Sequence, residues 1–364
     1  MIPRRGVLST TRLFALAALG LAGCMAVPRL DPLPLPRQTE TPLPPDMSFT
    51  MDDGMVLPAR AWLPPAGTPW RGVILALHGY TDSRDGWEMP APGFAAAGYA
   101  VFAPDQRGFG ASPDRGTWAG TDRMVADAAD IATQLRARHP GQRLIVMGES
   151  MGGAVALVLN ATHPGLADAT VLLAPAVWGW GQIDPKLGVA LLAADSVAPG
   201  WKPNPGSVDI NIAASDNRDA LIRMGRDKLT LLRPTVDSMR GVVDLMTAAQ
   251  RDAPKLTGPV LILDGRRDQV VPPPATARVW AHLPAAVRRA FYPNGYHLLL
   301  RDKDRALVAA DILSWLENPD AWLPSGADVA AGAWQADQAW VGGSTGALPA
   351  GRLDGLGLPK VWPY

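Results

Sequence analysis

A serine flanked by glycines, in Gly148-Glu149-Ser150-Met151-Gly152, is the segment of this sequence that most directly suggests chemistry. It follows the apolar run 144–147 and opens a helix-like stretch, 152–162. On a sharp turn between a buried strand and a helix a serine hydroxyl is exposed, and flanking glycines let the strand and the helix approach closely. We therefore expect Ser150 to act as a nucleophile and the backbone N–H of Met151 to stabilise an oxyanion.

A serine nucleophile needs a base, and the sequence offers five histidines. His139 and His163 each precede a proline at an expected helix end, where capping or solvent exposure accounts for them. His78 belongs to a loop motif, and His282 lies in a helix-like stretch. His297 remains, just beyond the last expected strand, where the chain order Ser, Asp, His requires the base.

Two aspartates follow the expected strand 260–263, Asp264 at its end and Asp268 in the loop beyond. We favour Asp268 as the orienting acid, because a residue beyond the strand end can reach over to His297. Asp264 is then interpreted as a turn or capping residue.

A loop motif, His78-Gly79-Tyr80, follows the expected strand 72–77. A second oxyanion donor is commonly supplied at such a position, so the sequence predicts the backbone N–H of Tyr80 in this role, unless the motif merely makes a turn. This chemistry requires no cofactor, and we expect no metal site.

Elements that could position these residues alternate along the chain. Runs that are apolar on both faces are typical of buried parallel strands, and they occur at 72–77, 99–103, 144–147, 170–174, 260–263 and, weakly, 289–292. Helix-like segments lie between them, at 86–97, 122–138, 152–162, 274–282 and 303–317. The alternation predicts an α/β fold with a doubly wound, mostly parallel sheet, preceded by a hairpin around Asp52-Asp53-Gly54.

We divide this core into residues 47–177 and 259–318, because 178–258 separate two strands by far more than a usual crossover. The inserted segment has helical patches, which predict a cap over the carboxyl ends of the strands, where ligands bind in open α/β sheets. Its apolar residues within 187–192 and 221–232 either select an acyl chain or form the cap's own small core. Residues 319–364 contain four tryptophans, which we expect to dock this extension on the core or on the cap.

The first residues are typical of a secretory signal, with a basic start, a short apolar run and small residues before position 24. Leu21-Ala22-Gly23-Cys24 resembles the bacterial lipoprotein box, which predicts a signal peptide at 1–23 and lipid attachment to Cys24. Proline-rich residues 24–46 would form a tether. The expected location is the bacterial cell envelope, anchored to a membrane and facing the periplasm or the outer surface. The alternative is a conventionally cleaved signal with an incidental cysteine.

Charge excludes one class of partner. Lys and Arg number 34, as do Asp and Glu, so no global field favours nucleic acid. A small, largely apolar or zwitterionic substrate fits better.

Together these motifs, with Ala103-Pro104-Asp105-Gln106-Arg107-Gly108-Phe109-Gly110-Ala111-Ser112, resemble the monoacylglycerol lipase and lysophospholipase branch of the α/β-hydrolases over about residues 48–316. The resemblance implies that Asp105 and Arg107 hold a loop together and that the cap shapes an acyl pocket. One departure is the stretch Thr81-Asp82-Ser83-Arg84, where the family usually continues with glycines.

The leading hypothesis is hydrolysis of a lipid-like carboxylic ester through an acyl-enzyme. A serine aminopeptidase with the same triad is the alternative, and it would need an acidic group for the substrate amine. Haloalkane or epoxide hydrolysis is disfavoured, because those enzymes carry Asp where Ser150 stands. A non-catalytic lipoprotein would predict a broken triad, whereas every component is present.

Overall fold

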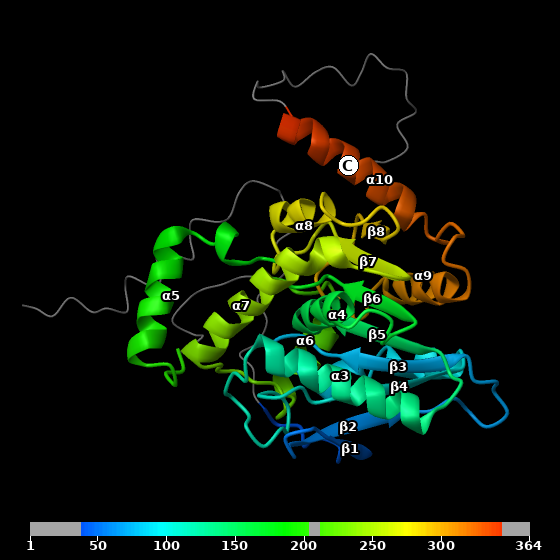
Figure 1. The fold of residues 1–364 in the computed structure, drawn as a ribbon, viewed down its shortest axis with the longest axis horizontal. Helices are drawn as coiled ribbons and strands as arrows, with labels where there is room; N and C mark the ends of the chain where they lie inside the picture. Colours follow the sequence, from blue (N-terminus) through cyan, green and yellow to red (C-terminus); the bar gives the residue numbers. More distant parts are fainter. Residues whose placement is uncertain (1–37, 204–211, 344–364) are drawn as a thin grey trace, which may run out of the picture.

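The computed structural model describes residues 38–203 and 212–343 of the 364-residue chain (Figure 1). Eight strands form one sheet in the order β1-β2-β4-β3-β5-β6-β7-β8. They are β1 (Met47–Thr50), β2 (Val56–Trp62), β3 (Gly72–Leu77), β4 (Tyr99–Pro104), β5 (Leu144–Glu149), β6 (Ala169–Leu173), β7 (Val260–Gly265) and β8 (Arg288–Tyr292). Strands β3 to β8 pair in parallel, while the hairpin of β1 and β2 joins β4 in antiparallel register. The predicted α/β fold with a mostly parallel sheet is confirmed.

Helices cover both faces of this sheet, which explains why β3, β4, β5 and β7 are buried along their whole length. Alternate side chains of β3 enter different cores: Val73 and Leu75 join one cluster, and Ile74 joins the other. The first cluster includes residues of α3 (Thr121–Arg138), α4 (Met151–Thr162), α7 (Val236–Asp252) and α8 (Pro273–Trp280). The second includes residues of α2 (Ala91–Ala96) and α9 (Arg305–Glu317). This is the two-sided burial that continuous apolar strands require.

The segment predicted to be a cap, 178–258, is mainly helical. It contains η2 (Trp180–Gln182), α5 (Pro185–Val197), α6 (Arg218–Arg226), α7 and η4 (Ala253–Lys255). Helix α7 packs on α4 and α3, and α5 lies against α7 on the side away from the sheet (Figure 1). Two apolar groups within it differ, since Leu221, Leu229 and Leu231 are buried while Val189 and Leu192 are exposed. The first group is therefore packing, whereas the second group leaves apolar side chains of α5 exposed.

The C-terminal extension forms a helix that the sequence analysis did not anticipate, α10 (Ala327–Gly343), which packs on the edge strand β8. Its Trp334 stacks on Phe291 of that strand with ring centroids 4.6 Å apart. Trp322 is 73% exposed and has the guanidinium of Arg288 over its ring. The expected docking through tryptophans is thus seen for Trp334, against the core; the other two predicted tryptophans lie outside the described side chains. Covering β8 also protects a sheet edge that would otherwise be open to pairing.

The described chain begins beside the cap. Gln38 donates from its side-chain amide to the carbonyl oxygens of Asp227, at 3.0 Å, and of Thr230, at 2.6 Å. Glu40 forms an ion pair with Arg223 at 2.8 Å. Cys24, the predicted signal peptide and most of the predicted tether lie outside the described residues. None of the described helices is long and apolar enough to cross a bilayer.

Candidate active site

Ser150 occupies a strained turn between β5 and α4. Its φ of 55° and ψ of −116° lie in a region that side-chain-bearing residues rarely adopt. Its N–H donates to the carbonyl of Leu173 at the end of β6, and its carbonyl accepts from Ala176 N–H, both at 2.9 Å. Hydrogen bonds to the end of β6 and to the residues just after it therefore fix both the N–H group and the carbonyl group of Ser150.

Glycines on both sides of Ser150 allow this turn. A Cβ atom on Gly148 would clash with the carbonyl group of Gly152, and a Cβ atom on Gly152 would clash with that of Leu77. The close approach of strand and helix that the sequence predicts is thus present, and it extends to β3. Leu77 directly precedes His78-Gly79-Tyr80, so the contact between Gly152 and Leu77 also places that loop close to Ser150.

Asp268 and His297 meet where the sequence analysis expects them to. His297 Nδ1 lies 2.7 Å from one carboxylate oxygen of Asp268, and the other oxygen accepts from the N–H groups of Val270, at 2.7 Å, and Val271, at 2.9 Å. Both side chains are buried. Gly265 and Gly295 are in close backbone contact, which brings the loop of the acid against the loop of the base.

Ser150 and His297 follow β5 and β8, whose carboxyl ends lie at the same edge of the sheet. With Nδ1 bound to Asp268, Nε2 is the ring nitrogen that remains to accept the serine proton. The described contacts contain no hydrogen bond between the two side chains. Hydrogen bonds of this kind often become short only when substrate is bound.

The environment of His297 changes its pKa in two opposing ways. Burial lowers the pKa, but the charge of Asp268 and its hydrogen bond raise it, with further contributions from Glu149 and Asp264. The net result is a pKa above the ordinary histidine value. The neutral imidazole that a general base requires is therefore populated only at higher pH than for an exposed histidine.

The other four histidines have structural roles or lie at the surface. His78 is buried, which lowers its pKa, and its Nε2 accepts from Gln106 N–H at 3.0 Å while Nδ1 bonds to the carbonyl of Gly79. His139 and His163 are the C-cap residues of α3 and α4. His282 lies just beyond α8 rather than inside a helix. Elimination by sequence context therefore agrees with the geometry.

The loop expected to supply an oxyanion donor lies directly beside the serine. A Cβ atom on Gly79 would be 3.4 Å from Cβ of Ser150 and 3.9 Å from its Oγ. The cap holds this loop, since Tyr80 Oη donates to Ser238 Oγ at 3.1 Å and the Thr81 carbonyl accepts from Leu231 N–H at 2.7 Å. Met151 begins α4, and the N–H groups of a first helical turn have no acceptor within their own helix.

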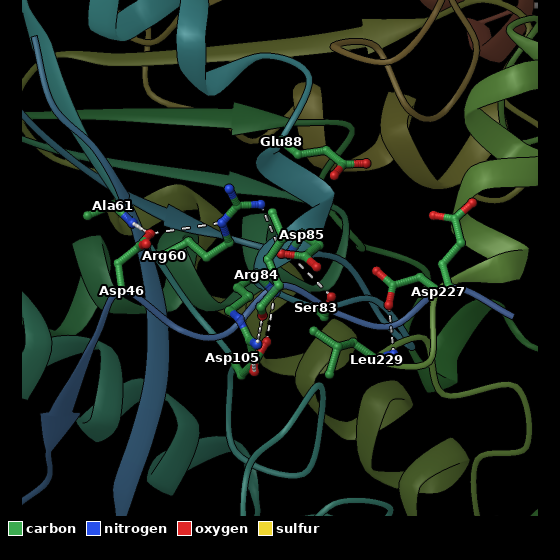
Figure 2. Close-up of polar contacts among 12 residues, drawn as sticks. Asp46, Arg60, Ala61, Ser83, Arg84, Asp85, Glu88, Asp105, Asp227 and Leu229 are labelled. Carbon is green, nitrogen blue, oxygen red and sulfur yellow. Dashed lines mark hydrogen bonds and ion pairs between the residues drawn. The ribbon is translucent and has the colours of Figure 1, made fainter. Parts of the chain in front are cut away.

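Residues 82–84, which depart from the family pattern, fix the far end of this loop (Figure 2). Arg84 is buried and forms an ion pair with Asp105, whose carboxylate also accepts from the N–H groups of Arg84, at 2.8 Å, and Ala111, at 2.9 Å. Ser83 accepts from Asp85 N–H and caps η1 (Arg84–Trp87). Arg107 pairs with Asp127 at 2.7 Å. The resemblance implied that Asp105 and Arg107 hold a loop together, and their contacts are of that kind.

A buried arginine that the sequence analysis missed links this loop to the nucleophile turn. Arg301 Nη2 donates to Asp82 at 2.6 Å and also to Glu149, the residue before Ser150. Burial lowers the pKa of Arg301, but Asp82 and Glu149 more than offset this, so that the guanidinium stays charged. The available signal was Glu149 itself, because a carboxylate at the end of a buried strand requires a cation.

The interpretation of Asp264 as a turn or capping residue was wrong. Strand β7 runs to Gly265, two residues beyond the expected end, so Asp264 is a buried strand residue. Its Oδ2 accepts from Trp280 Nε1 at 2.8 Å. Burial and the charge of Asp268 raise the pKa of Asp264 to about 7.

Within the described part of the chain, no group of three or more His, Cys, Asp or Glu side chains could hold a metal ion. The structure pairs a buried aspartate with a histidine at the sheet edge that also carries a serine on a strained turn. These features and the sheet define a serine hydrolase with the α/β-hydrolase fold.

The sequence profile of the family described as serine aminopeptidase, S33, matches residues 68–304, and the chain belongs to this family. It is 28% identical to the monoacylglycerol lipase of Mycolicibacterium smegmatis over 277 residues, covering 74% of this chain and 95% of that protein. It is also 28% identical to the human monoglyceride lipase, over 65% of this chain and 78% of the relative. The solved monoacylglycerol lipase of Paleococcus ferrophilus superposes with a TM-score of 0.61 at 24% identity, covering 71% of this chain and 98% of that one. The chain is a serine ester hydrolase.

Replacing Gly152 tests the close contact at the nucleophile turn. Gly152→Ala places a methyl group against the backbone of Leu77, which cannot move as a side chain can, so we expect a loss of about 3 kcal/mol of unfolding free energy. Gly332→Ala, at an open position inside α10, should instead stabilise by about 0.5–1 kcal/mol. Urea denaturation of both variants measures this difference; equal stabilities would contradict the packing described here.

Replacing Asp268 tests the pairing with His297. Asp268→Asn should lower kcat on the order of 10⁴-fold, because the imidazole is no longer held in the required tautomer. It also removes the charge that raises the pKa of His297, so the acid limb of kcat/KM should move to lower pH. A pH profile in which Asp268→Asn keeps the wild-type rate and limb would assign the acid elsewhere.

Proposed function

We propose that this enzyme hydrolyses carboxylic esters with apolar acyl chains, of the monoacylglycerol or lysophospholipid kind, through a Ser150–His297–Asp268 acyl-enzyme mechanism. The single observation that supports it best is the buried Asp268–His297 pair, 2.7 Å apart, at the same sheet edge as the strained Ser150. An imidazole bound to a carboxylate through Nδ1 has Nε2 available as the base, which is the arrangement that activates a serine.

In this mechanism His297 Nε2 accepts the proton of Ser150 Oγ as Oγ attacks the ester carbonyl carbon. The N–H groups of Tyr80 and Met151 stabilise the oxyanion, and one such donor typically contributes about 3 kcal/mol to the transition state. The imidazolium then gives its proton to the departing alcohol oxygen, leaving an acyl group on Ser150. Water attacks this ester with the same base, and the carboxylic acid leaves.

The cap supports an apolar substrate. Helix α5 buries only Gly188 and exposes the apolar side chains of Val189, Leu192 and Val197. Exposed apolar side chains on the segment predicted to be a cap suit a lipid better than a polar substrate. The relatives named monoacylglycerol lipase and monoglyceride lipase support the same substrate class.

We also propose that Cys24 carries the lipid that anchors the enzyme at the bacterial cell envelope. The side-chain amide of Gln38 donates hydrogen bonds to the cap, at the carbonyl oxygens of Asp227 and Thr230. Thirteen residues separate Gln38 from Cys24, and such a stretch reaches at most about 50 Å when fully extended. An anchored enzyme would therefore keep its cap within reach of the membrane.

Aminopeptidase activity is the second candidate, because the matching family is described as serine aminopeptidase. An amine-binding carboxylate would be needed close to Ser150. Glu149 and Asp82 lie nearby, but both are paired with Arg301, so neither offers a free charge to a substrate amine. This pairing favours the ester.

A substrate series separates the two candidates. Each buried methylene of an acyl chain contributes about 0.8 kcal/mol, so turnover of p-nitrophenyl esters by protein starting at residue 25 should rise with chain length until the pocket is full. Aminoacyl anilides should be poor substrates, and Ser150→Ala should remain folded and inactive on all of them. Preference for the anilides would establish the peptidase instead, and an active Ser150→Ala would remove the proposed nucleophile.

Mass spectrometry of the mature N-terminus tests the anchor. Several acyl chains on Cys24 give stable membrane attachment, whereas a single chain gives only marginal binding, about 10⁴ M⁻¹. Cys24→Ser should therefore prevent lipid attachment and release the enzyme from the membrane fraction without lowering its turnover of short esters. An unmodified N-terminus at a residue other than Cys24 in the membrane-derived protein is the outcome that refutes this.

A further inference from the structure

Asp264 is a second buried carboxyl beside the Asp268–His297 pair. It lies one residue before the end of β7, opposite Phe291 of β8, and is only 3% exposed. Its Oδ2 accepts from Trp280 Nε1 at 2.8 Å. Because the indole N–H of Trp280 donates to this carboxyl group, the position of the Trp280 ring determines how the carboxyl group is oriented.

The C-terminal extension holds that indole. Trp280 is almost fully buried and stands edge-on to Trp334 of α10, with centroids 5.0 Å apart, and to Phe291, at 6.2 Å. Trp334 itself stacks on Phe291. Helix α10 is fixed in turn by Asp328, which pairs with Arg288 of β8 at 2.7 Å. This helix lies beyond residue 304, where the match to the family profile ends.

Several charged groups surround the side chains of His297 and Asp264. His297 faces Asp268 from the acid loop, Glu149 from the end of β5 and Asp264 from β7, and Arg301 neutralises Glu149. Asp264 faces Asp268 and His297, whereas α8 presents a neutral indole to it. Ionised Asp264 therefore adds negative charge beside the imidazole, and protonated Asp264 does not.

We propose that Asp264 is a positioning residue for the base, setting the charge around His297, and that α10 supports it through Trp334 and Trp280. The proposal rests on the catalytic roles of Ser150, Asp268 and His297 given above. When His297 accepts the serine proton, the ionised Asp264 stabilises the imidazolium together with Asp268. Because burial and Asp268 raise the pKa of Asp264 to about 7, this support is present at alkaline pH and fades as the pH falls.

Asp264→Asn tests the charge while retaining an oxygen that can accept from Trp280. Removing the charge should lower the pKa of His297 and move the acid limb of kcat/KM down by about half a pH unit, which corresponds to a factor of about three. On the alkaline plateau kcat should fall about threefold with KM unchanged, and the deficit should shrink toward acid pH. A purely structural defect would instead lower the rate by the same factor at every pH.

Asp252→Asn is the control. Asp252 is also buried, but it pairs with Arg251 at 2.6 Å and is not among the charges that face His297. This variant should keep the wild-type limb. Trp334→Ala should weaken the hold on Trp280 and shift the limb in the direction of Asp264→Asn, whereas Trp322→Ala, at an exposed ring, should not.

The measurement uses the full chain purified in detergent. Imidazole NMR titration of His297, in Ser150→Ala with and without Asp264→Asn, gives the same shift independently of turnover. If Asp264→Asn does not fold, Trp280→Phe removes the indole donor and should move the limb in the same direction. If neither the acid limb of kcat/KM nor the NMR pKa of His297 changes in the variant that folds, the proposal is overturned. The roles of Ser150 and Asp268 are tested separately by Ser150→Ala and Asp268→Asn. Absence of ester turnover in the wild type would instead reject the proposed function.

Discussion

One buried guanidinium, that of Arg301, joins the parts from which the active site is built. It binds Asp82 in residues 78–84, the loop proposed to supply an oxyanion donor (the oxyanion loop), and Glu149 beside the proposed nucleophile Ser150, and it lies four residues after His297. Its Nη1 also contacts Met224 of the cap at 3.8 Å. Removing one partner of such a buried group typically costs about 3–5 kcal/mol, because the remaining charge is left uncompensated. Ser150, the oxyanion loop, His297 and the cap are therefore stabilised as one unit rather than as separate loops.

The same sheet edge carries the backbone strain. Among the described residues, the non-glycine positions with positive φ are Thr81, Ser150 and Ala174, and each lies just past β3, β5 or β6. Ser150 and Ala174 are held by hydrogen bonds to the next strand, from Ser150 N–H to Leu173 and from Ala174 N–H to Leu263. Strained conformations persist where surrounding structure fixes them. The parallel sheet thus stabilises the turn that carries Ser150.

Local patterns made the sheet and the candidate triad predictable, whereas long-range partners were not. A strand, Gly-x-Ser-x-Gly and a helix occupy consecutive residues, so the position of Ser150 could be inferred from sequence alone. Arg301 pairs with residues 82 and 149, and no local pattern shows which distant carboxylates it meets. Asp264 was misinterpreted because β7 extends two residues past the apolar run. Helix α10 was not predicted although its alanines favour a helix, because residues 319–364 were interpreted only through the docking of their tryptophans.

The cap forms hydrogen bonds with the loops of the candidate site, so removing it would disturb both substrate binding and the positions of those loops. Cap residues bond to each loop of the site: Leu231 and Ser238 to the oxyanion loop, Ala213 to Gln269 of the acid loop, and Ala214 to Leu298 beside the base. Exchanging the whole cap for a short linker would remove these supports together with any acyl-binding surface. Helix α5 is different, because it rests on α7 and buries little of its own surface. Substitutions of its exposed Val189 and Leu192 therefore test the proposed acyl selectivity without removing the hydrogen bonds of the loops around Ser150 and His297.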